Sequence, residues 1–442
     1  MMNSSVFPRV TGRSLPRARR AEGALIYDAD GKRYLDACGG AIVVGVGHGN
    51  EAVIDALARQ QHDVAYVHGT QFTTAALEDY ASALAEVLPL EDARVYTVSG
   101  GSEAVETALK LARAYHLARG DEGRHKVIAR AGSYHGNSLN ALDASGRMPL
   151  RAPYEPWLGR TVRVGTPYEY RCGRDGHPQR CGESLAEELD RAIVEQGPDS
   201  VACFIAEPVA GATLGAAVPP DDYWDAVGGV CRSHGVLLIA DEVMTGFGRT
   251  GRWFACEHWG LEPDIVVAGK GASSGYWPLG FAACSGSIYD AVSSTGFIHG
   301  FTYSHSPVGA AVGLAVLDQL RAHDLVNESR NKGERLQALL HEHLGNHPHV
   351  GDVRGLGLMV GVELVADPDS KAPFPRSERV TERLVAAAFE AGLLLYPSTG
   401  CADGVDGDLV MIGPPFVISD AELEEAVALL RGVIEGVLEQ VP

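Results

Sequence analysis

Apolar runs of strand length alternate with helix-like segments through the middle of the chain. The clearest runs are ARVYTVSG (residues 93–100), VACFIAEPV (201–209), GVLLIADEV (235–243) and DIVVAGKG (264–271). A segment with helical periodicity, SEAVETALKLARAYHLA, follows the first of them. Continuous apolar strands that alternate with helices are typical of a parallel sheet covered by helices. The sequence therefore predicts an α/β fold with a mostly parallel central sheet.

Polar residues stand at the ends of several of these runs. Serine and glycine occupy positions 99–102, Glu207 follows the second run, and Asp241 and Lys270 come near the ends of the third and fourth. In open α/β sheets, ligands bind beyond the carboxyl ends of the strands. We therefore expect these side chains to converge on one site.

The two ends of the chain indicate a second, smaller domain. The stretch ALIYDADGKRYLDACGG has the pattern of a hairpin with its turn at Asp30 and Gly31. A long helical pattern runs through 320–345, another helix is expected near 377–391, and GLGLMVG at 355–361 is interpreted as a turn between strands. The expected division is an N-terminal segment of the small domain at 1–60, a large cofactor-binding domain at 61–320, and the C-terminal part of the small domain at 321–442.

The charge balance argues against several kinds of partner. The 442 residues include 37 Lys and Arg against 57 Asp and Glu, which gives a formal net charge of −20. Such a chain repels nucleic acids and anionic membrane surfaces, and no apolar stretch approaches the length of a membrane span. The eight cysteines form no regular framework, as is typical of reduced thiols in a cytosolic protein. We therefore expect a cytoplasmic protein that binds small molecules.

One turn-rich loop, YEYRCGRDGHPQRCGE, contains residue types that can bind zinc: Cys172, His177 and Cys181. Three candidates without a paired Cys-x-x-Cys motif have poor spacing for a metal site. The sequence therefore predicts no metal at this loop. His48 and His68 are likewise interpreted as packing or polar contacts and not as metal ligands.

Three of the strand-end features have complementary chemistry. The segment SGGSEAVETALK offers small residues, hydroxyl groups and free backbone amides at the start of a helix, and such a terminus can cradle a phosphate. Asp241 can hold a proton on a heteroaromatic nitrogen, which keeps that ring an electron sink. Lys270 can form a Schiff base with an aldehyde. A phosphate cradle, an aspartate and a lysine in this order indicate a site for pyridoxal 5'-phosphate (PLP).

The motifs around these residues resemble those of the class III aminotransferases, which belong to the fold type I PLP enzymes. The resemblance runs from about residue 20 to 435 and rests on GGSEAVETALKLAR, YHG, EPV, ADEVMTGFGRTG, AGKG, PLG, GFTYSHSP and RGLGLMVGVEL, in the family's order. It implies a large domain with a mostly parallel sheet and a smaller α+β domain built from both ends of the chain. It also implies a transaminase that moves an amino group between an amine or ω-amino substrate and a keto acid or aldehyde.

The same resemblance assigns four residues to the phosphate and to the two faces of the cofactor ring. Gly101 and Ser102 match positions that bind the phosphate. Tyr134 matches a residue that stacks on one face of the ring, and Val243 matches one that presses on the other face. These assignments are implied by the family and not by the spacing alone.

The remaining assignments concern the reaction and the assembly. Asp241 matches the residue that pairs with the ring nitrogen, and Lys270 matches the one that carries the Schiff base and transfers the proton. Glu207 matches a family glutamate close to the ring, whereas His135 is interpreted as structural. Thr302 matches a residue that reaches the phosphate bound by a neighbouring subunit, which implies a homodimer with shared active sites or a tetramer of such dimers.

Alternative activities remain open at this point. Gly246, Gly248 and Gly251 form a GxGxxG pattern after a strand-like run, as in nicotinamide-dependent oxidoreductases. Asp241 precedes these glycines where bare backbone amides are needed, and the next run ends in Lys270 instead of an acid, so this class is disfavoured. Decarboxylases, aminomutases and racemases of the resembled fold use the same residues, and the motifs do not separate them from transaminases.

The sequence departs from the family where many members bind an α-carboxylate. Met411 stands in place of an arginine that grips this group, and Ala212 replaces an acid with which some members pair that arginine. Gly40 and Ala41 stand where bulkier residues often narrow the pocket, which indicates room for a larger substrate. We therefore expect a reacting amine whose carbon carries no carboxylate, unless another cation replaces the missing one; the candidates are Arg9, Arg13 and Arg249.

Overall fold

A seven-stranded sheet forms the centre of the protein, whose computed structural model describes residues 5–12, 14–173 and 180–441. Its strands, in spatial order, are β4 (Arg94–Val98), β10 (Gly280–Cys284), β9 (Ile265–Ala268), β8 (Leu237–Asp241), β7 (Val201–Ala206), β5 (Lys126–Arg130) and β6 (Thr161–Val164). Strand β10 is antiparallel to both of its neighbours, and the strands from β9 to β6 are parallel to one another. The prediction of a mostly parallel sheet is therefore confirmed.

Both faces of this sheet are buried, which explains why its strands are continuously apolar. Leu238 of β8 belongs to a core that includes helices α7 (Cys181–Gln196) and α8 (Tyr223–His234). The next residue, Ile239, belongs to a second core that includes helix α4 (Gly101–Ala118). Because side chains alternate along a strand, successive residues of β8 pack against helices on opposite faces.

Shorter helices complete the large domain. They are α3 (Ala75–Ala85), α5 (Leu139–Ala144), α6 (Met148–Arg151) and α9 (Gly286–Ser293). Helix α2 (Glu51–Asp63) packs against α10 (Pro307–Ala322), and Asn50 caps it by accepting a hydrogen bond from Val53 N. A four-residue helix, α1 (Gly39–Ile42), follows the N-terminal strands.

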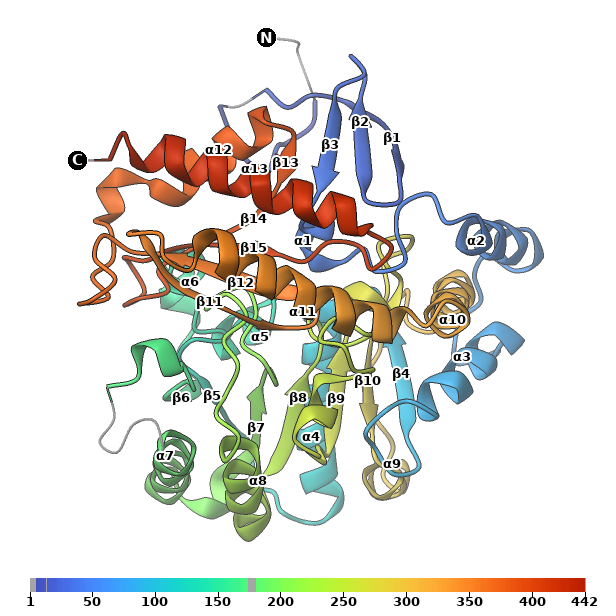
Figure 1. Ribbon diagram of the computed structural model, residues 1–442. Helices are drawn as coiled ribbons and strands as arrows, with labels where there is room; N and C mark the ends of the chain where they lie inside the picture. Colours follow the sequence, from blue (N-terminus) through green and yellow to red (C-terminus); the bar gives the residue numbers. More distant parts are fainter. Residues whose placement is uncertain (1–4, 13, 174–179, 442) are drawn as a thin grey trace.

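The N-terminal and C-terminal segments form the smaller domain together, as the fold class predicted. Strands β1 (Ala18–Glu22), β2 (Leu25–Asp28) and β3 (Arg33–Asp36) are joined by β13 (Leu393–Leu394), which runs parallel to β3. Figure 1 shows these blue strands beside the red C-terminal helices, above the central sheet. A third sheet and three helices complete this part: β11 (Val350–Leu356), β12 (Met359–Leu364), β15 (Asp408–Ile412), β14 (Tyr396–Thr399), α11 (Leu325–Leu344), α12 (Val380–Glu390) and α13 (Asp420–Leu438).

The local predictions for this domain are mostly confirmed. The β2–β3 hairpin turns at Asp30 and Gly31, and Gly31 has a φ of +85°. Strands β11 and β12 are joined at Gly357, as expected for a tight turn. The prediction of a long helical segment through 320–345 is wrong in one respect, because two helices meet there: α10 ends at Ala322 and α11 starts at Leu325. Asp324 adopts a left-handed conformation (φ +50°) between them, which ends the regular helical hydrogen bonding.

Across the described ranges, no helix is long and apolar enough to span a bilayer.

Candidate active site

A pocket of about 190 Å³ lies at the carboxyl ends of the parallel strands, where the topology places ligands. It is lined by every residue predicted to contact the cofactor except Thr302: Gly101, Ser102, Tyr134, Glu207, Asp241, Val243 and Lys270. These residues come from segments that are far apart in the sequence. The sheet brings them together because β5, β7, β8 and β9 are parallel neighbours whose carboxyl ends meet. Strand β4, which precedes Gly101, lies beyond β10 and is antiparallel to it.

One end of the pocket is the start of helix α4. Gly101 is the first residue of the helix, and the N–H groups of the first turn of a helix have no partner within it. A Cβ atom at Gly101 would lie 2.9 Å from Val243 Cγ1, so only glycine fits at this contact. The Ser102 hydroxyl accepts a hydrogen bond from Asn137 N at 3.0 Å and can still donate one. This end offers several donors and a helix N-terminus to an anion.

Asp241 is the last residue of β8, and two hydrogen bonds hold its carboxylate. Oδ2 lies 2.6 Å from His135 Nδ1, and both side chains are buried. Oδ1 accepts the backbone N–H of Val243 at 3.0 Å. His135 Nε2 has no hydrogen-bond partner within the part of the chain that the structure describes. The interpretation of His135 as only structural therefore missed its contact with Asp241; its position beside Tyr134 was the available signal.

Lys270 follows β9 and lines the same pocket. Its backbone has a φ of +42°, which a non-glycine residue adopts only when the surrounding structure enforces it. Burial of the amine lowers the pKa of Lys270 to about 8, although the carboxylates of Asp241 and Glu207 act in the opposite direction. A lysine with such a pKa has a substantial neutral fraction at neutral to mildly alkaline pH, and only the neutral amine is a nucleophile.

Glu207 is buried and supports the pocket through backbone contacts. Its Oε1 accepts Gly211 N at 3.0 Å, and its Oε2 accepts Tyr134 N at 3.2 Å. The Arg130 guanidinium lies 4.0 Å from Oε2 and donates to the carbonyl oxygen of Glu207. Burial raises the pKa of Glu207, while the charge of Arg130 lowers it. Glu207 therefore holds two loops of the pocket in place, including the one that carries Tyr134.

Thr302 does not line the pocket of its own chain. It lies on an exposed loop before helix α10, near large apolar side chains that are also exposed. Ile298 is 99% exposed and Tyr303, the residue after Thr302, is 66% exposed. Apolar surface of this kind marks a site of association with another protein.

The glycine pattern at 246–251 lies in a series of turns after β8, and no α-helix follows it directly. A dinucleotide fingerprint needs a helix that opens at the glycines, because the helix N-terminus binds the pyrophosphate. Gly248 and Gly251 have φ values of +90° and +82°. The turns therefore require glycine at these two positions for conformational reasons. The structure therefore gives no support to the nicotinamide-dependent alternative.

An apolar cluster occupies the place where many family members have an arginine for the α-carboxylate; its members Ala212 and Met244 line the cofactor pocket, whereas Met411 does not. Met411 of β15 is fully buried and belongs to the same apolar cluster as Ala212 and Met244. Arg249 does not replace the missing cation, because its guanidinium donates to the carbonyl oxygens of Leu358, Pro414 and Val44.

Two further cations were candidates for this replacement. Arg9 is exposed, and its charge lowers the pKa of Tyr134, which desolvation raises more strongly. Arg13 lies outside the described residues. Gly40 and Ala41 line neither this pocket nor the larger cavity beside it, and the wider pocket expected from them stays a prediction.

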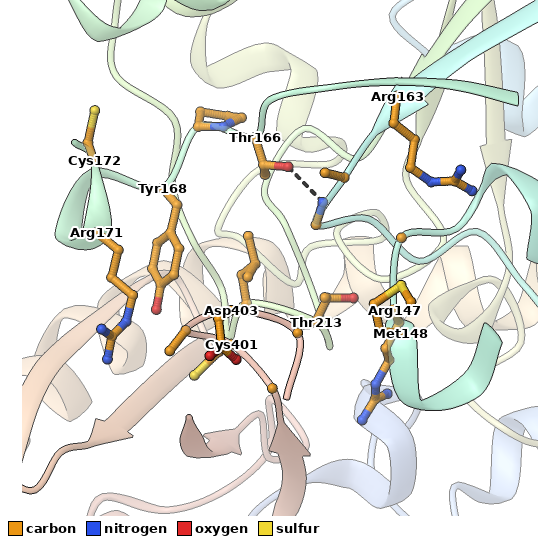
Figure 2. A pocket seen from close by; sticks show the side chains of 18 of the residues that line it. Arg147, Met148, Arg163, Thr166, Tyr168, Arg171, Cys172, Thr213, Cys401 and Asp403 are labelled. Carbon is orange, nitrogen blue, oxygen red and sulfur yellow. Dashed lines mark hydrogen bonds between the residues drawn. The ribbon is translucent and has the colours of Figure 1, made fainter. Parts of the chain in front are cut away.

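The larger cavity, of about 540 Å³, lies between β5, β6, α6 and the loop that follows β14 (Figure 2). Cys172 and Cys181 both border it, and their Sγ atoms are 2.8 Å apart. The third candidate zinc ligand, His177, lies outside the described residues. The described residues contain no group of three or more His, Cys, Asp or Glu side chains arranged to hold a metal ion.

The smaller pocket fits a planar cofactor with an anionic group. The anion can bind at the N-terminus of α4, the ring can lie between Tyr134 and Val243, and Asp241 and Lys270 face the pocket together. The family model described as Aminotransferase class-III matches residues 8–434. The chain belongs to this family. It is therefore a PLP-dependent transaminase with small-molecule substrates, as the motifs predicted.

Several curated relatives align over nearly the whole chain. The uncharacterized aminotransferase YodT of Bacillus subtilis is 38% identical over 99% of this chain and 98% of its own. The putrescine–pyruvate aminotransferase of Pseudomonas aeruginosa is 34% identical over 94% of this chain and 90% of its own. The chain thus resembles these aminotransferases along its full alignment and not in one motif.

Solved structures of transaminases also resemble this chain over nearly its whole length. An (S)-enantioselective omega-transaminase from Thermomicrobium roseum is 37% identical and superposes with a TM-score of 0.89, over 96% of this chain and 93% of its own. The omega transaminase from Pseudomonas jessenii, solved in complex with PMP, is 30% identical with a TM-score of 0.93, over 99% and 97% of the two chains. Fold type I and the α/β class are therefore established for this chain.

Proposed function

We propose that this transaminase takes an amino group from an amine or ω-amino compound whose reacting carbon carries no carboxylate, and passes it to a keto acid or an aldehyde. The observation that carries the proposal is the apolar cluster that contains Met411 and Ala212. A carboxylate buried against Ala212 and Met244, the members of this cluster that line the pocket, would lose its hydration without a compensating cation. The names of the putrescine–pyruvate aminotransferase and the omega-transaminase relatives agree with such a donor.

The proposal assigns the site residues the following roles. Gly101 and Ser102 bind the cofactor phosphate through backbone amides and a hydroxyl group. Tyr134 and Val243 confine the ring from its two faces. These roles are supported by the helix N-terminus at α4 and by the shared pocket.

Two side chains carry the chemistry in this proposal. Bound PLP supplies an aldehyde that condenses with amines and a ring that accepts electrons. With PLP bound, Asp241 would hold a proton on the ring nitrogen, and Lys270 Nζ would move a proton from the substrate carbon to the cofactor carbon on the other side of the shared nitrogen. Glu207 orients the pocket through the backbone of Tyr134. The lowered pKa of Lys270 suits this work, because a proton acceptor must be neutral before it acts.

We also propose a homodimer with shared active sites, or a tetramer of such dimers, in which Thr302 contacts the phosphate bound by the neighbouring subunit. The exposed apolar side chains around Thr302 support this assembly. A cytoplasmic location is supported by the eight scattered cysteines, which form no regular disulfide framework. The proposed divisions of the chain remain 1–60, 61–320 and 321–442, and the separate sheets of the N-terminal, central and C-terminal parts support them.

A half-reaction screen tests the proposed donor. The purified PLP form is mixed separately with putrescine, 4-aminobutyrate, alanine and glutamate, and conversion to the pyridoxamine form is followed by absorbance. We expect the amine or the ω-amino acid to react faster than glutamate by at least about tenfold. A clear preference for α-amino acids, in this half-reaction and in the reverse one, would contradict the proposal.

A further inference from the structure

The larger cavity and the cofactor pocket are lined by neighbouring residues of the same loops. Gly132 and Thr213 line the larger cavity, whereas their close neighbours in sequence, Tyr134 and Ala212, line the pocket. Two loops therefore border both spaces. The larger cavity therefore lies directly beside the cofactor pocket.

Four arginines line the larger cavity, and three of them bind carboxylates or several carbonyl oxygens of the protein, although Nη2 of Arg171 makes an ion pair and no hydrogen bond with a described residue. Arg151 donates to the carbonyl oxygens of Leu142 and Ser145 and to Glu155. The other two are also engaged: Arg163 donates to the carbonyl oxygens of Asp143 and Ser145, and Arg171 pairs with buried Glu363.

Arg147 is the exception among these four. Among the described residues, its guanidinium makes one hydrogen bond, a long one from Nη2 to Ser398 Oγ at 3.4 Å. Its Nε atom is buried without a partner among the described residues, and no ion pair between described residues includes it. Thr213, which is 6% exposed, has a buried Oγ1 that also lacks a described partner. Both residues line the same cavity, and Figure 2 shows them in the same part of its wall.

The segment that carries Arg147 is held firmly against the active site. Ser145 Oγ accepts the backbone N–H of His135, whose side chain bonds to Asp241. Gly146 N donates to the Ser133 carbonyl oxygen, and a Cβ at Gly146 would lie 1.6 Å from the Ala131 carbonyl oxygen. Arg147 therefore has a defined position relative to the reacting groups. Its charge also acts on the pocket, because it lowers the pKa of both Tyr134 and Lys270.

A partly buried guanidinium without an anion is costly, and its planar donors match a carboxylate. The carboxylates that border the cavity are otherwise engaged or exposed. Glu155 accepts from Arg151, Asp403 accepts the N–H groups of Val405 and Asp406, and Glu169 is exposed. None of these three carboxylates pairs with Arg147.

We propose that Arg147, with the hydroxyl group of Thr213, binds the distal carboxylate of an ω-amino acid whose amino group reacts in the cofactor pocket. This inference rests on the proposed function and names the substrate class more narrowly. In this arrangement the carboxylate of the substrate lies in the larger cavity, away from the apolar cluster that contains Met411. The reacting carbon then carries no carboxylate, and the missing arginine is not needed.

The test compares donors that differ only in the distal carboxylate. Half-reaction rate constants are measured with 6-aminohexanoate and with pentylamine for the wild-type enzyme, Arg147→Met and Thr213→Val. We expect Arg147→Met to lower the rate constant with 6-aminohexanoate by about 10²-fold, because a charged hydrogen-bonded contact is lost. The rate constant with pentylamine should fall by less than about threefold. Thr213→Val should slow only 6-aminohexanoate, by about three- to tenfold. Arg147→Lys should recover part of the loss, because it keeps the charge but not the planar donors.

Arg160→Met is the matched control, because Arg160 is exposed and its loss changes the net charge equally. This substitution should leave the rate constants with both donors unchanged. Equal slowing of both donors by Arg147→Met, or no slowing of either, would overturn the assignment. A wild-type enzyme that reacts with pentylamine but not with 6-aminohexanoate would also overturn it, while the proposed function would stand.

Binding of hexanoate provides a readout that does not depend on the reaction. Hexanoate carries the carboxylate without the amine, and its affinity is measured by calorimetry on the PLP form. We expect Arg147→Met to weaken hexanoate binding by at least about tenfold and Arg160→Met to leave it unchanged. If no amine reacts with the wild-type enzyme, the proposed function fails, and this measurement still decides the carboxylate site. Equal hexanoate affinity in the wild type and Arg147→Met would exclude the site.

Discussion

The imidazole Nδ1 of His135 lies 2.6 Å from Oδ2 of Asp241, and neither side chain is appreciably exposed to solvent. A hydrogen bond between such groups is strong in a dry environment and fixes the direction of the carboxylate. The other oxygen of Asp241 accepts the N–H of Val243. Asp241 is thus held from two sides and cannot turn away from the pocket without breaking one of these bonds.

Replacement of His135 by Leu should impair catalysis although His135 is assigned no contact with the substrate. The lost hydrogen bond frees the Asp241 carboxylate, so we expect kcat to fall about 10- to 10²-fold and the cofactor to dissociate faster. Steady-state kinetics and the rate of cofactor loss on dialysis measure these effects. His125→Leu is the control, because His125 is exposed and its ring hydrogen-bonds to the nearby Gly123 carbonyl oxygen. An unchanged kcat in a folded His135→Leu protein would contradict the positioning role.

Replacement of Lys270 by Ala should abolish turnover and still allow PLP to bind. The phosphate contacts at α4 and the ring contacts of Tyr134 remain, whereas the covalent link and the proton carrier are lost. Turnover is assayed after any wild-type enzyme is removed, and bound cofactor is measured by absorbance after gel filtration. Borohydride treatment followed by mass spectrometry should show a covalent adduct only in the wild type. Near-normal turnover by the variant would refute the assignment of Lys270.

The rate at which the cofactor-free protein captures PLP covalently should rise with pH, with a midpoint at about 8. Only the neutral amine of Lys270 reacts, and burial lowers its pKa from the ordinary 10.5 to about 8. Asp241 raises this pKa, so Asp241→Asn should move the midpoint to a lower pH. Stopped-flow absorbance between pH 6 and 10 measures both midpoints. A wild-type midpoint near 10.5 would show that the amine is not desolvated.

Thr302→Ala should weaken cofactor retention in an enzyme that is active only as a dimer. The loss of one hydroxyl contact to a phosphate corresponds to about a three- to tenfold weaker affinity. Thr295→Ala is the control, because Thr295 is exposed in the same region and its hydroxyl bonds only within its own turn. Sedimentation at the assay concentration gives the oligomeric state. A monomer with full activity would exclude the shared active site.

Much of the fold was predictable from local patterns. The continuous apolar strands VACFIAEPV and GVLLIADEV indicated a sheet buried on both faces, and β7 and β8 are such strands. The turns at Gly31 and Gly357 followed from residues that tolerate a positive φ. The break between α10 and α11 was not predicted, because His323 and Asp324 interrupt the helix through a local backbone conformation that apolar periodicity does not show.

The sequence by itself determined which residue types meet at the site, because the order of strands and the polar residues at their ends are local properties. It named Asp241, Lys270 and the helix start at Gly101, which one pocket brings together. Only the tertiary structure decided which groups are already satisfied. It showed that Arg249 is committed to backbone carbonyls, that His135 bonds to Asp241, and that Arg147 retains an unpaired donor. Hydrogen-bond partners come from segments distant in the sequence, and only folding brings those segments into contact.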